Sequence, residues 1–365
     1  MTEIAIILGT RPEIIKLSPV IRECEERGIE YTVIHTGQHY SDNLDTVFFE
    51  RLELPKPDYN LSVGSKSHGK QTSEMLADIE EILLDIDADI VLVQGDTNSV
   101  LAGAIATSKL DADLGHIEAG LRSFNREMPE ETNRVVTDHV ADYLFAPTEQ
   151  SAEYLREEGL PDERIIVTGN TVVDALYRNQ KIAEEKSSIL REFDIIDEDY
   201  FLMTAHRAEN VDNSDSFEEI LSGVSIAANR ENVIVIYPIH PRAENKLEEF
   251  GISVPPGIRL VEPQDYLGFL KLQANAKLVL TDSGGVQEEA CILGVPCVTI
   301  RENTERPETV SVGANQLSGI DAEGIADSVE CMLKTDIDWD NPFGDGTAGS
   351  RIIEEFITTS AEVKQ

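Results

Sequence analysis

The chain has 365 residues, and its 30 basic and 69 acidic side chains give a formal net charge of −39. Such a charge disfavours binding to nucleic acid, and no apolar run reaches the length of about 18 residues that a membrane span requires. The acidic excess favours a protein adapted to a salt-rich cytoplasm, where ions screen the repulsion, over an ordinary acidic protein.

From the N-terminus onward, short apolar runs alternate with segments of helical period. Strands are expected at Ile4–Leu8, Tyr31–Thr36, Ile90–Val93, Leu114–Ile117, Tyr143–Phe145 and Arg164–Val167, and then at Phe201–Thr204, Val233–Tyr237, Ile258–Val261, Leu278–Leu280 and Cys297–Ile300. This alternation predicts an α/β fold with parallel sheets that are covered by helices on both faces. We therefore expect two doubly wound, Rossmann-like domains that face each other across a cleft, with ligands at the carboxyl ends of the strands.

The first helix carries its own start and stop signals. Thr10 and Glu13 have the spacing of a capping box, and Pro12 suits an early helical position. Gly28 is placed to end the helix, because glycine readily adopts the left-handed conformation that follows a last helical turn.

The charged stretch Asn179–Asp199 separates the two sets of strands. It predicts domains at 1–175 and 176–349, with a C-terminal helix at about 350–365 that can pack back on the first domain. The four cysteines show no metal-ligand spacing, and the N-terminus runs straight into an expected strand. A reducing cytoplasm and no metal site are the simple interpretation.

The segment Asp282–Glu289 follows an apolar strand and opens an expected helix with two glycines. Backbone N–H groups at a helix start have no partner within the helix, and phosphate is their usual occupant. Glu289 lies one to two turns into the helix, where a carboxylate can reach a ribose hydroxyl. The segment therefore predicts a site for a nucleotide diphosphate, although most such turns only connect a strand to a helix.

Further polar clusters follow other expected strands. Asp96 and Glu118 come after neighbouring strands, so both can project into one cleft, and crowded carboxylates near phosphate suit proton transfer. Asp96 could instead cap the helix that follows it, and Glu130 could be a solvated charge at a helix start. His206 could bind phosphate or be an ordinary residue at a strand end. Arg11 and Arg306 could neutralise phosphate or form surface ion pairs.

Taken together, the motifs resemble the non-hydrolysing UDP-N-acetylglucosamine 2-epimerase family over most of the chain. The matching segments are Gly9–Glu13, Thr36–His39, Gln94–Thr97, His116–Arg122, Pro129–Arg134, Glu262–Tyr266, Asp282–Glu289 and Thr304–Glu308. Each segment alone is weak evidence, but their occurrence in one order along the chain is highly specific.

The resemblance implies a fold like that of the GT-B glycosyltransferases and inversion at C2 of UDP-N-acetylglucosamine (UDP-GlcNAc) to give UDP-N-acetylmannosamine (UDP-ManNAc). It implies anti elimination of UDP to 2-acetamidoglucal and syn re-addition, without a cofactor or metal. The implied catalytic residues are Asp96, Glu118, Glu130 and His206. The implied substrate-binding residues are Arg11, Lys16, Gln264, Phe269, Ser283, Gly284, Gly285, Glu289 and Arg306.

Bacterial members of this family also bind a second UDP-GlcNAc as an activator, and the family is usually homodimeric. The matching residues for an activator site are Gln38, His39, Gln71, Arg207 and His240. The chain continues with Tyr40-Ser41, where bacterial members usually have an arginine, so it departs from the pattern at this point.

Four alternatives stay open on the sequence alone. A relative could act on another UDP-2-acetamido sugar of the uronic acid or FucNAc type, and a hydrolysing epimerase would release free ManNAc. A GT-B glycosyltransferase would need an acceptor groove. A sensor of nucleotide sugars would need Ser283 and Glu289 but neither Asp96 nor Glu118.

Overall fold

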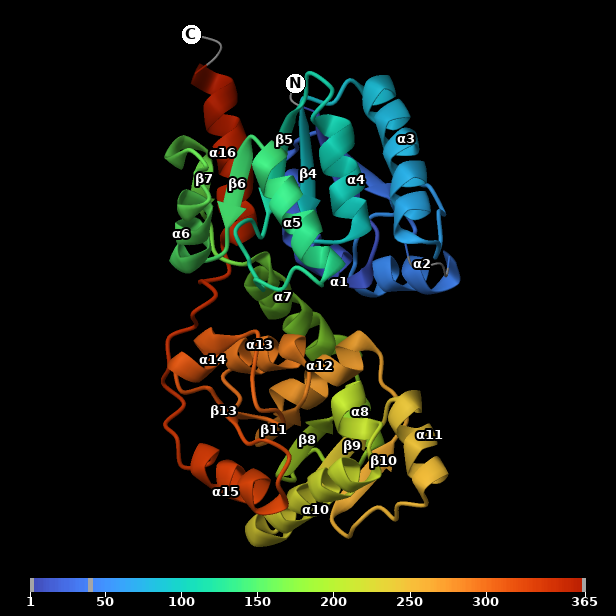
Figure 1. Cartoon of the computed structure of the whole chain (residues 1–365), viewed down its shortest axis with the longest axis vertical. Coiled ribbons are helices and arrows are strands. Elements are labelled where there is room, and N and C mark those ends of the chain that lie inside the picture. The colour runs from blue at the N-terminus through green and yellow to red at the C-terminus, as the bar shows by residue number, and fades with distance from the viewer. Residues whose placement is uncertain (1–2, 39–41, 363–365) are drawn as a thin grey trace. The chain divides into compact units, whose positions relative to one another are not determined.

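The structure is a computed structural model that describes the backbone of residues 3–38 and 42–362 and the side chains of 3–38 and 47–357. The chain forms two compact units (Figure 1). Unit 1 comprises Met1–Tyr177 and Phe343–Gln365, and unit 2 comprises Arg178–Pro342. Among the described residues, no helix is both long and apolar enough to cross a lipid bilayer.

Unit 1 contains a seven-stranded sheet with the order β3-β2-β1-β4-β5-β6-β7, and all of its strands are parallel. The strands are β1 (Ile4–Leu8), β2 (Tyr31–His35), β3 (Tyr59–Asn60), β4 (Ile90–Gln94), β5 (Asp113–Ile117), β6 (Tyr143–Ala146) and β7 (Ile165–Val167). Every residue of β1 and β4 is buried, because helices cover both faces of the sheet.

The helices of unit 1 connect consecutive strands. They are α1 (Arg11–Arg27), α2 (Asp42–Arg51), α3 (His68–Ile86), α4 (Asn98–Thr107), α5 (Pro129–Val140) and α6 (Glu149–Glu157), with a short 3₁₀ turn at Asp162–Arg164. α7 (Thr171–Lys186) begins in unit 1 and ends in unit 2. α1 starts and ends where the sequence predicts, since the Glu13 carboxylate accepts the Gly9 and Thr10 N–H groups and Gly28 is left-handed with φ 65°.

Unit 2 contains a parallel six-stranded sheet with the order β10-β9-β8-β11-β12-β13. Its strands are β8 (Tyr200–Thr204), β9 (Ile234–Pro238), β10 (Ile258–Val261), β11 (Leu278–Thr281), β12 (Cys297–Thr299) and β13 (Asn315–Leu317). Its helices are α8 (Ile189–Glu192), α9 (Ala208–Val211), α10 (Ser214–Glu231), α11 (Pro241–Phe250), α12 (Tyr266–Ala274), α13 (Gly284–Leu293), α14 (Pro307–Ser311) and α15 (Ala322–Met332).

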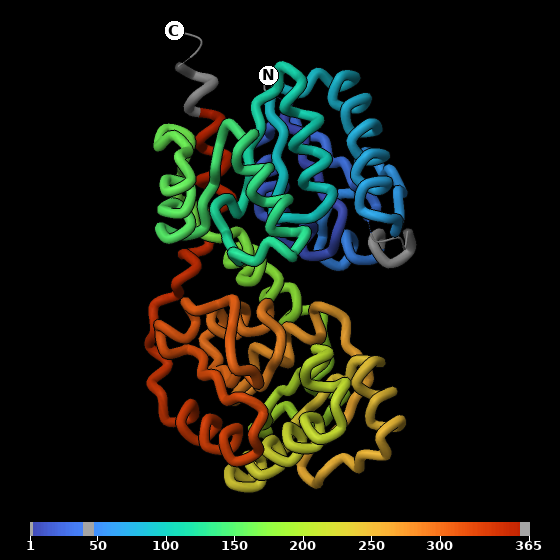
Figure 2. The backbone as a smooth tube through the Cα atoms, in the orientation of Figure 1, coloured from blue at the N-terminus to red at the C-terminus, as the bar shows by residue number. Residues whose placement is uncertain are grey.

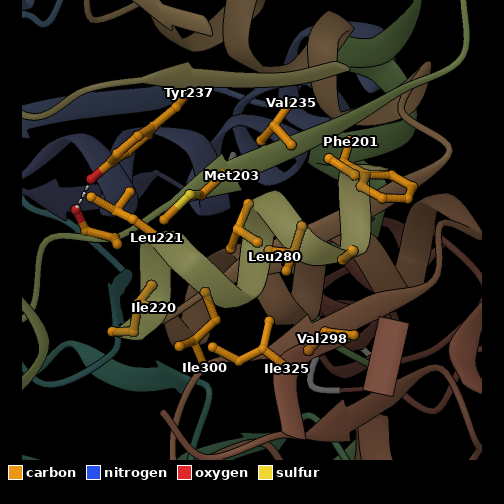
Figure 3. Packing of buried hydrophobic residues seen from close by; sticks show 14 of the residues in the cluster. Phe201, Met203, Ile220, Leu221, Val235, Tyr237, Leu280, Val298, Ile300 and Ile325 are labelled. Atoms are coloured by element: carbon orange, nitrogen blue, oxygen red, sulfur yellow. Dashed lines mark hydrogen bonds between the residues drawn. The ribbon is translucent and has the colours of Figure 1, made fainter. Parts of the chain in front are cut away.

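The core of unit 2 packs α10 and α15 against one face of this sheet. Figure 3 shows Phe201, Val235 and Leu280 within this apolar cluster. The buried Tyr237 hydroxyl donates to the backbone oxygen of Ala205 at 2.7 Å, so the one polar atom of that ring is satisfied inside the core.

The last helix, α16 (Ala348–Glu362), belongs to unit 1. Figure 2 shows the segment before the C-terminus returning to unit 1, where α16 packs against β6. Phe356 packs edge-on against the rings of Tyr143 and Phe145, and Arg27 of α1 pairs with Glu354 at 3.1 Å. The C-terminal helix therefore completes the core of the unit in which the chain begins.

The predicted α/β fold with two doubly wound parallel sheets is confirmed, and every strand expected from the sequence has a counterpart. The sequence missed β3 and β13, which are two of the four edge strands and are two and three residues long. The units divide after residues 177 and 342, whereas the sequence placed the boundaries at 175 and 349. The second difference arises because Phe343 already bonds to Asn170 of unit 1, through an N–H···O contact of 2.8 Å.

Candidate active site

The strand order of unit 1 reverses between β1 and β4, and ligands of doubly wound sheets bind at such a point. Three neighbouring strands end there. Gly9 and Thr10 follow β1, Asp96 follows β4, and Glu118 follows β5. The topology therefore brings together the two carboxylates that the sequence predicts for proton transfer.

Glu118 is held in an uncommon backbone conformation with φ 69°, which residues other than glycine seldom adopt. The residue is only 6% exposed, and its carboxylate is surrounded by donors. Lys16 Nζ lies 2.6 Å from Oε1, Asn170 Nδ2 lies 2.9 Å from the same oxygen, and Gln94 Nε2 donates to Oε2. The carboxylate is thus aimed by residues from three separate segments.

Asp96 does not cap α4, so that alternative is wrong. The N-cap is Thr97, whose side chain accepts the Val100 N–H. The Asp96 carboxylate pairs instead with Arg134 of α5, and Asn133 Nδ2 donates to the Asp96 backbone oxygen at 2.9 Å. Side chain and backbone of Asp96 are both fixed by α5.

Glu130 and Glu131 open α5, and they lie in different surroundings. Glu131 is buried and accepts the N–H groups of Ser123 and Phe124, each at 2.9 Å, and the Ser123 hydroxyl at 2.8 Å. Burial acts to raise its pKa, but these hydrogen bonds and Arg134 outweigh burial and hold the pKa below its usual range. Glu131 therefore anchors the preceding loop, whereas Glu130, the residue predicted for catalysis, lies half-buried in the first turn of α5.

A buried ionic cluster lies behind the loop of Asp96. His116 Nδ1 is 2.6 Å from Asp138 Oδ1, and His116 Nε2 is 2.8 Å from the backbone oxygen of Gly95. Arg122 Nη1 lies 2.7 Å from Asp138 Oδ2. Burial acts to raise the pKa of Asp138, but His116 and Arg122 outweigh it and hold the pKa below its usual range. The cluster ties the ends of β4 and β5 to α5.

Arg11 and Lys16 both lie on α1, but they differ in exposure and partners. Arg11 is exposed and lies over the Phe48 ring at 5.9 Å, while Lys16 contacts Glu118. Beneath them, the Glu13 carboxylate also accepts the Thr97 hydroxyl at 2.6 Å, and burial raises the pKa of Glu13. Gly9 is sterically required, since an added Cβ would lie 2.1 Å from Thr36 Oγ1.

The strand order of unit 2 reverses between β8 and β11, and His206 and Asp282 follow these two strands. Asp282 is fully buried, and its Oδ2 accepts the N–H groups of His206 and Arg207, both at 2.9 Å. His206 Nδ1 lies 3.1 Å from Asp282 Oδ1. Despite burial, which acts to raise it, the pKa of Asp282 is held low by His206 and these backbone donors. This contact directs Nε2 of His206 away from the core.

Helix α13 begins at Gly284, directly after Asp282 and Ser283. A Cβ placed on Gly285 would meet nothing within 4 Å, so packing does not require glycine there. Glycine costs about 0.5–1 kcal/mol relative to alanine inside a helix. Its presence leaves the first N–H groups of α13 open to close approach, which suits a phosphate group.

Two acidic side chains compensate the arginines beside this turn. Arg306 Nε lies 3.2 Å from Glu288 of α13. Glu305 accepts hydrogen bonds from Arg301, and these lower the pKa of Glu305 to about 2. Glu289 lies on α13 and is half-buried. The region therefore carries positive charge that is balanced by neighbouring carboxylates.

The remaining predicted residues are divided between the units. In unit 2, Phe269 packs against an apolar cluster, Gln264 donates to the Glu262 backbone oxygen, and the His240 and His206 rings lie 5.9 Å apart. Arg207 lies 3.4 Å from Glu305. In unit 1, Gln71 Nε2 donates to the Gln38 backbone oxygen at 3.2 Å. His39 lies outside the described residues.

Several residues that contact the predicted catalytic groups were not given a role from the sequence. They are Gln94, Arg134, Asn170 and Asp282. All except Asn170 lie inside the matching motifs, so motif membership was the available signal. Among the described residues, no group of His, Cys, Asp and Glu side chains is arranged to hold a metal ion.

Comparison with known proteins places this geometry in a family. The sequence profile described as UDP-N-acetylglucosamine 2-epimerase matches residues 22–357. The chain belongs to the UDP-N-acetylglucosamine 2-epimerase family. It is therefore a member of a family of isomerases, and the predicted relationship is confirmed.

The similarity to individual members extends over whole chains. The UDP-N-acetylglucosamine 2-epimerase of Methanocaldococcus jannaschii is 54% identical over 357 residues, which cover 96% of this chain and 98% of that protein. Its solved structure matches with a TM-score of 0.91 over 98% of this chain and 100% of that chain, at 52% identity. A second structure of that enzyme, in complex with UDP-GlcNAc and UDP, matches with a TM-score of 0.83, 53% identity and the same coverage.

A more distant relative is named for a different substrate. The UDP-2,3-diacetamido-2,3-dideoxy-D-glucuronate 2-epimerase of Pseudomonas aeruginosa is 41% identical, over 96% of this chain and 98% of that protein. Relatives named for different sugars thus align over nearly the whole chain.

Proposed function

We propose that this protein catalyses the reversible epimerisation of UDP-GlcNAc to UDP-ManNAc by anti elimination of UDP and syn re-addition. The observation that carries the proposal is the placement of two residue sets at two switch points. Glu118 and Asp96 follow β5 and β4 in unit 1, and Asp282, Ser283 and His206 follow β11 and β8 in unit 2. The M. jannaschii relative at 54% identity bears the name of this activity.

In the proposed reaction, a carboxylate of unit 1 removes the proton from C2 of the sugar. The electrons of that C–H bond form the C1–C2 double bond, and the C1–O bond breaks so that UDP leaves with its electron pair. Glu118, Asp96 and Glu130 are the proposed acid and base groups. UDP then re-adds at C1 while a proton reaches C2 on the opposite face. The net change is an inversion that consumes no cofactor.

The leaving group is a diphosphate, so its stabilisation requires donors and positive charge rather than proton chemistry alone. We assign this role to the start of α13 at Ser283, Gly284 and Gly285, together with His206, Arg306 and Arg11. Glu289 is proposed for the ribose, and Gln264 and Phe269 for the uridine. The contact between Asp282 and His206 supports the assignment, since it points the free edge of the imidazole outward.

The first test follows protons during turnover. In D₂O, we expect incubation with UDP-GlcNAc to place deuterium at C2 of both epimers, because the removed proton exchanges with solvent before re-addition. Long incubation is expected to release small amounts of UDP and 2-acetamidoglucal. NMR of the C2 and anomeric protons measures both effects. Epimerisation without deuterium incorporation would rule out elimination. Turnover of a UDP-2,3-diacetamido uronic acid, but not of UDP-GlcNAc, would favour the activity named for the P. aeruginosa relative.

The charge of −39 motivates a second test, on salt dependence. We propose adaptation to a salt-rich cytoplasm, and we expect the Tm to rise between about 0.1 M and about 2 M KCl. Over this range the Debye screening length falls from about 10 Å to below about 3 Å. Chloride is preferred to sulfate, since sulfate also strengthens apolar burial in proteins of any charge. A Tm that is flat or falls over this range removes the salt adaptation and leaves the epimerase proposal intact.

The same family resemblance supports further proposals about context. We propose a cytoplasmic homodimer that supplies UDP-ManNAc for surface polysaccharide synthesis. An activator site would use Gln38, His39 and Gln71 of unit 1 with Arg207 and His240 of unit 2. The contact between Gln71 and Gln38 supports the unit 1 part of that site.

A further inference from the structure

The two connections between the units come together inside unit 1. The chain leaves unit 1 through α7 and returns at Phe343. The Phe343 backbone oxygen accepts the Asn170 N–H at 2.8 Å. A Cβ on Gly344 would lie 3.2 Å from the Cα of Gly169, so the two backbones run in close approach. Asn170 thus lies where the outgoing and returning segments are joined.

The side chain of Asn170 is directed to the predicted catalytic carboxylate. Its Nδ2 donates to Glu118 Oε1 at 2.9 Å, and its Oδ1 accepts the Val172 N–H at 3.0 Å. The amide orientation is settled chemically, because a backbone N–H can only donate and so must face the oxygen. Asn170 is 4% exposed, and 52 residues separate it from Glu118 along the chain.

Glu118 needs such external support. Its left-handed backbone, with φ 69°, is unfavourable for a residue with a side chain and persists only when neighbouring residues impose it. Lys16 of α1 brings the positive charge to Oε1, Gln94 of β4 donates to Oε2, and Asn170 adds a neutral donor. A neutral hydrogen-bond donor favours the ionised form of the Glu118 carboxyl group without adding a second positive charge beside it.

We propose that Asn170 is a positioning residue for Glu118, which it fixes to the point where both connections between the units meet. This inference rests on the proton-transfer role proposed for Glu118. Asn170 does not touch the reacting atoms in this scheme. It holds one carboxylate oxygen, while its backbone holds the returning segment, so the carboxylate and the connection move together.

The decisive variant is Asn170→Asp. It keeps the size of the side chain and the acceptor for the Val172 N–H, and a carboxylate is favourable at a helix start. It replaces the donor to Glu118 Oε1 by a second negative charge. We expect turnover at neutral pH to fall about tenfold or more, and one limb of the pH–rate profile to move up by about one unit or more, because a like charge disfavours ionisation of Glu118. UDP affinity, which is assigned to residues of unit 2 and to Arg11 but not to Glu118 or Asn170, is expected to stay unchanged.

A stability cycle tests the contact without any substrate. Asn170→Asp is expected to lower the Tm, and Glu118→Gln added to it is expected to restore the Tm, because the new amide can donate to the new carboxylate. Additive Tm changes, or an Asn170→Asp enzyme with the wild-type pH–rate profile, would overturn the role of Asn170. If the wild-type protein lacks epimerase activity but Glu118→Gln still restores the Tm of Asn170→Asp, the proposed function is wrong and the link between Asn170 and Glu118 is retained.

Discussion

Glu118→Gln and Asp96→Asn are expected to reduce turnover of UDP-GlcNAc by at least about two orders of magnitude each, the usual range for the loss of a general acid or base being about 10² to 10⁴. Both changes keep the shape of the side chain and remove the group that exchanges a proton. Glu118 is held by Lys16, Gln94 and Asn170, and Asp96 by Arg134, so each substitution acts on a carboxylate that is already oriented. Turnover is measured by NMR at saturating substrate.

Two controls accompany these variants. Asp85→Asn makes the same chemical change on the exposed surface of α3 and is expected to leave turnover unchanged. Both catalytic variants are expected to bind UDP through unit 2, and UDP at about 100 times its Kd should stabilise each by about 2.7 kcal/mol. Retention of more than about a tenth of the wild-type turnover in Glu118→Gln would remove that residue from the proton-transfer scheme.

Asp138→Asn is expected to lower the free energy of unfolding by about 3–5 kcal/mol, since it removes the buried carboxylate that His116 and Arg122 share, and the other carboxylate on Arg122, that of Glu158, is partly exposed. Asp138 lies 2.6 Å from His116 Nδ1 and 2.7 Å from Arg122 Nη1. Its pKa is lower in the folded protein than the value of about 3.9 of an unfolded chain. The stabilisation is therefore complete above about pH 4 and is lost as the pH falls through the folded-state pKa.

Denaturant unfolding of wild type and Asp138→Asn at neutral and acidic pH measures this effect. The difference in free energy of unfolding should be largest at neutral pH and should shrink in acid. Asp162→Asn is the matched control, because Asp162 pairs with Arg156 at 2.6 Å on the surface, where such pairs contribute about 0–1 kcal/mol. A difference for Asp138→Asn as small as that of the control, or one that grows in acid, contradicts the expected role of the cluster.

The fold was predictable because its strands are continuous apolar runs. The residues of β1, Ile4–Leu8, are buried on both faces of a parallel sheet, so this strand appears in the sequence as an unbroken apolar run. β3 and β13 escaped prediction because Tyr59–Asn60 and Asn315–Leu317 contain polar residues and form no apolar run, unlike the equally short edge strand β7, Ile165–Val167. Tyr59–Asn60 has no fully buried residue, and its pairing to β2 depends on the backbone, which sequence patterns do not report.

The sequence predicted those residues of the candidate site that follow strands or lie in the matching motifs. Asp96 and Glu118 follow neighbouring strands, and this placement comes directly from chain order. The contact from Asn170 was not predictable, because Asn170 lies outside the motifs and reaches Glu118 through tertiary packing across 52 residues, and the pairing of Arg134 with Asp96, 38 residues apart, was not visible although Arg134 lies in a motif. The difference between Glu130 and Glu131 was also hidden, since adjacent carboxylates look alike until one of them is buried under a loop.

The return of α16 to unit 1 has a consequence for synthesis on the ribosome. Domains that fold as they emerge usually do so from the N-terminus. Here residues 178–342 are contiguous in unit 2, whereas unit 1 lacks the buried Ile352, Ile353 and Phe356 until all of unit 2 has been synthesised. The half of the protein made first is therefore the half completed last. Until then, the apolar surface around Tyr143 and Phe145 stays exposed on the nascent chain and is accessible to chaperones.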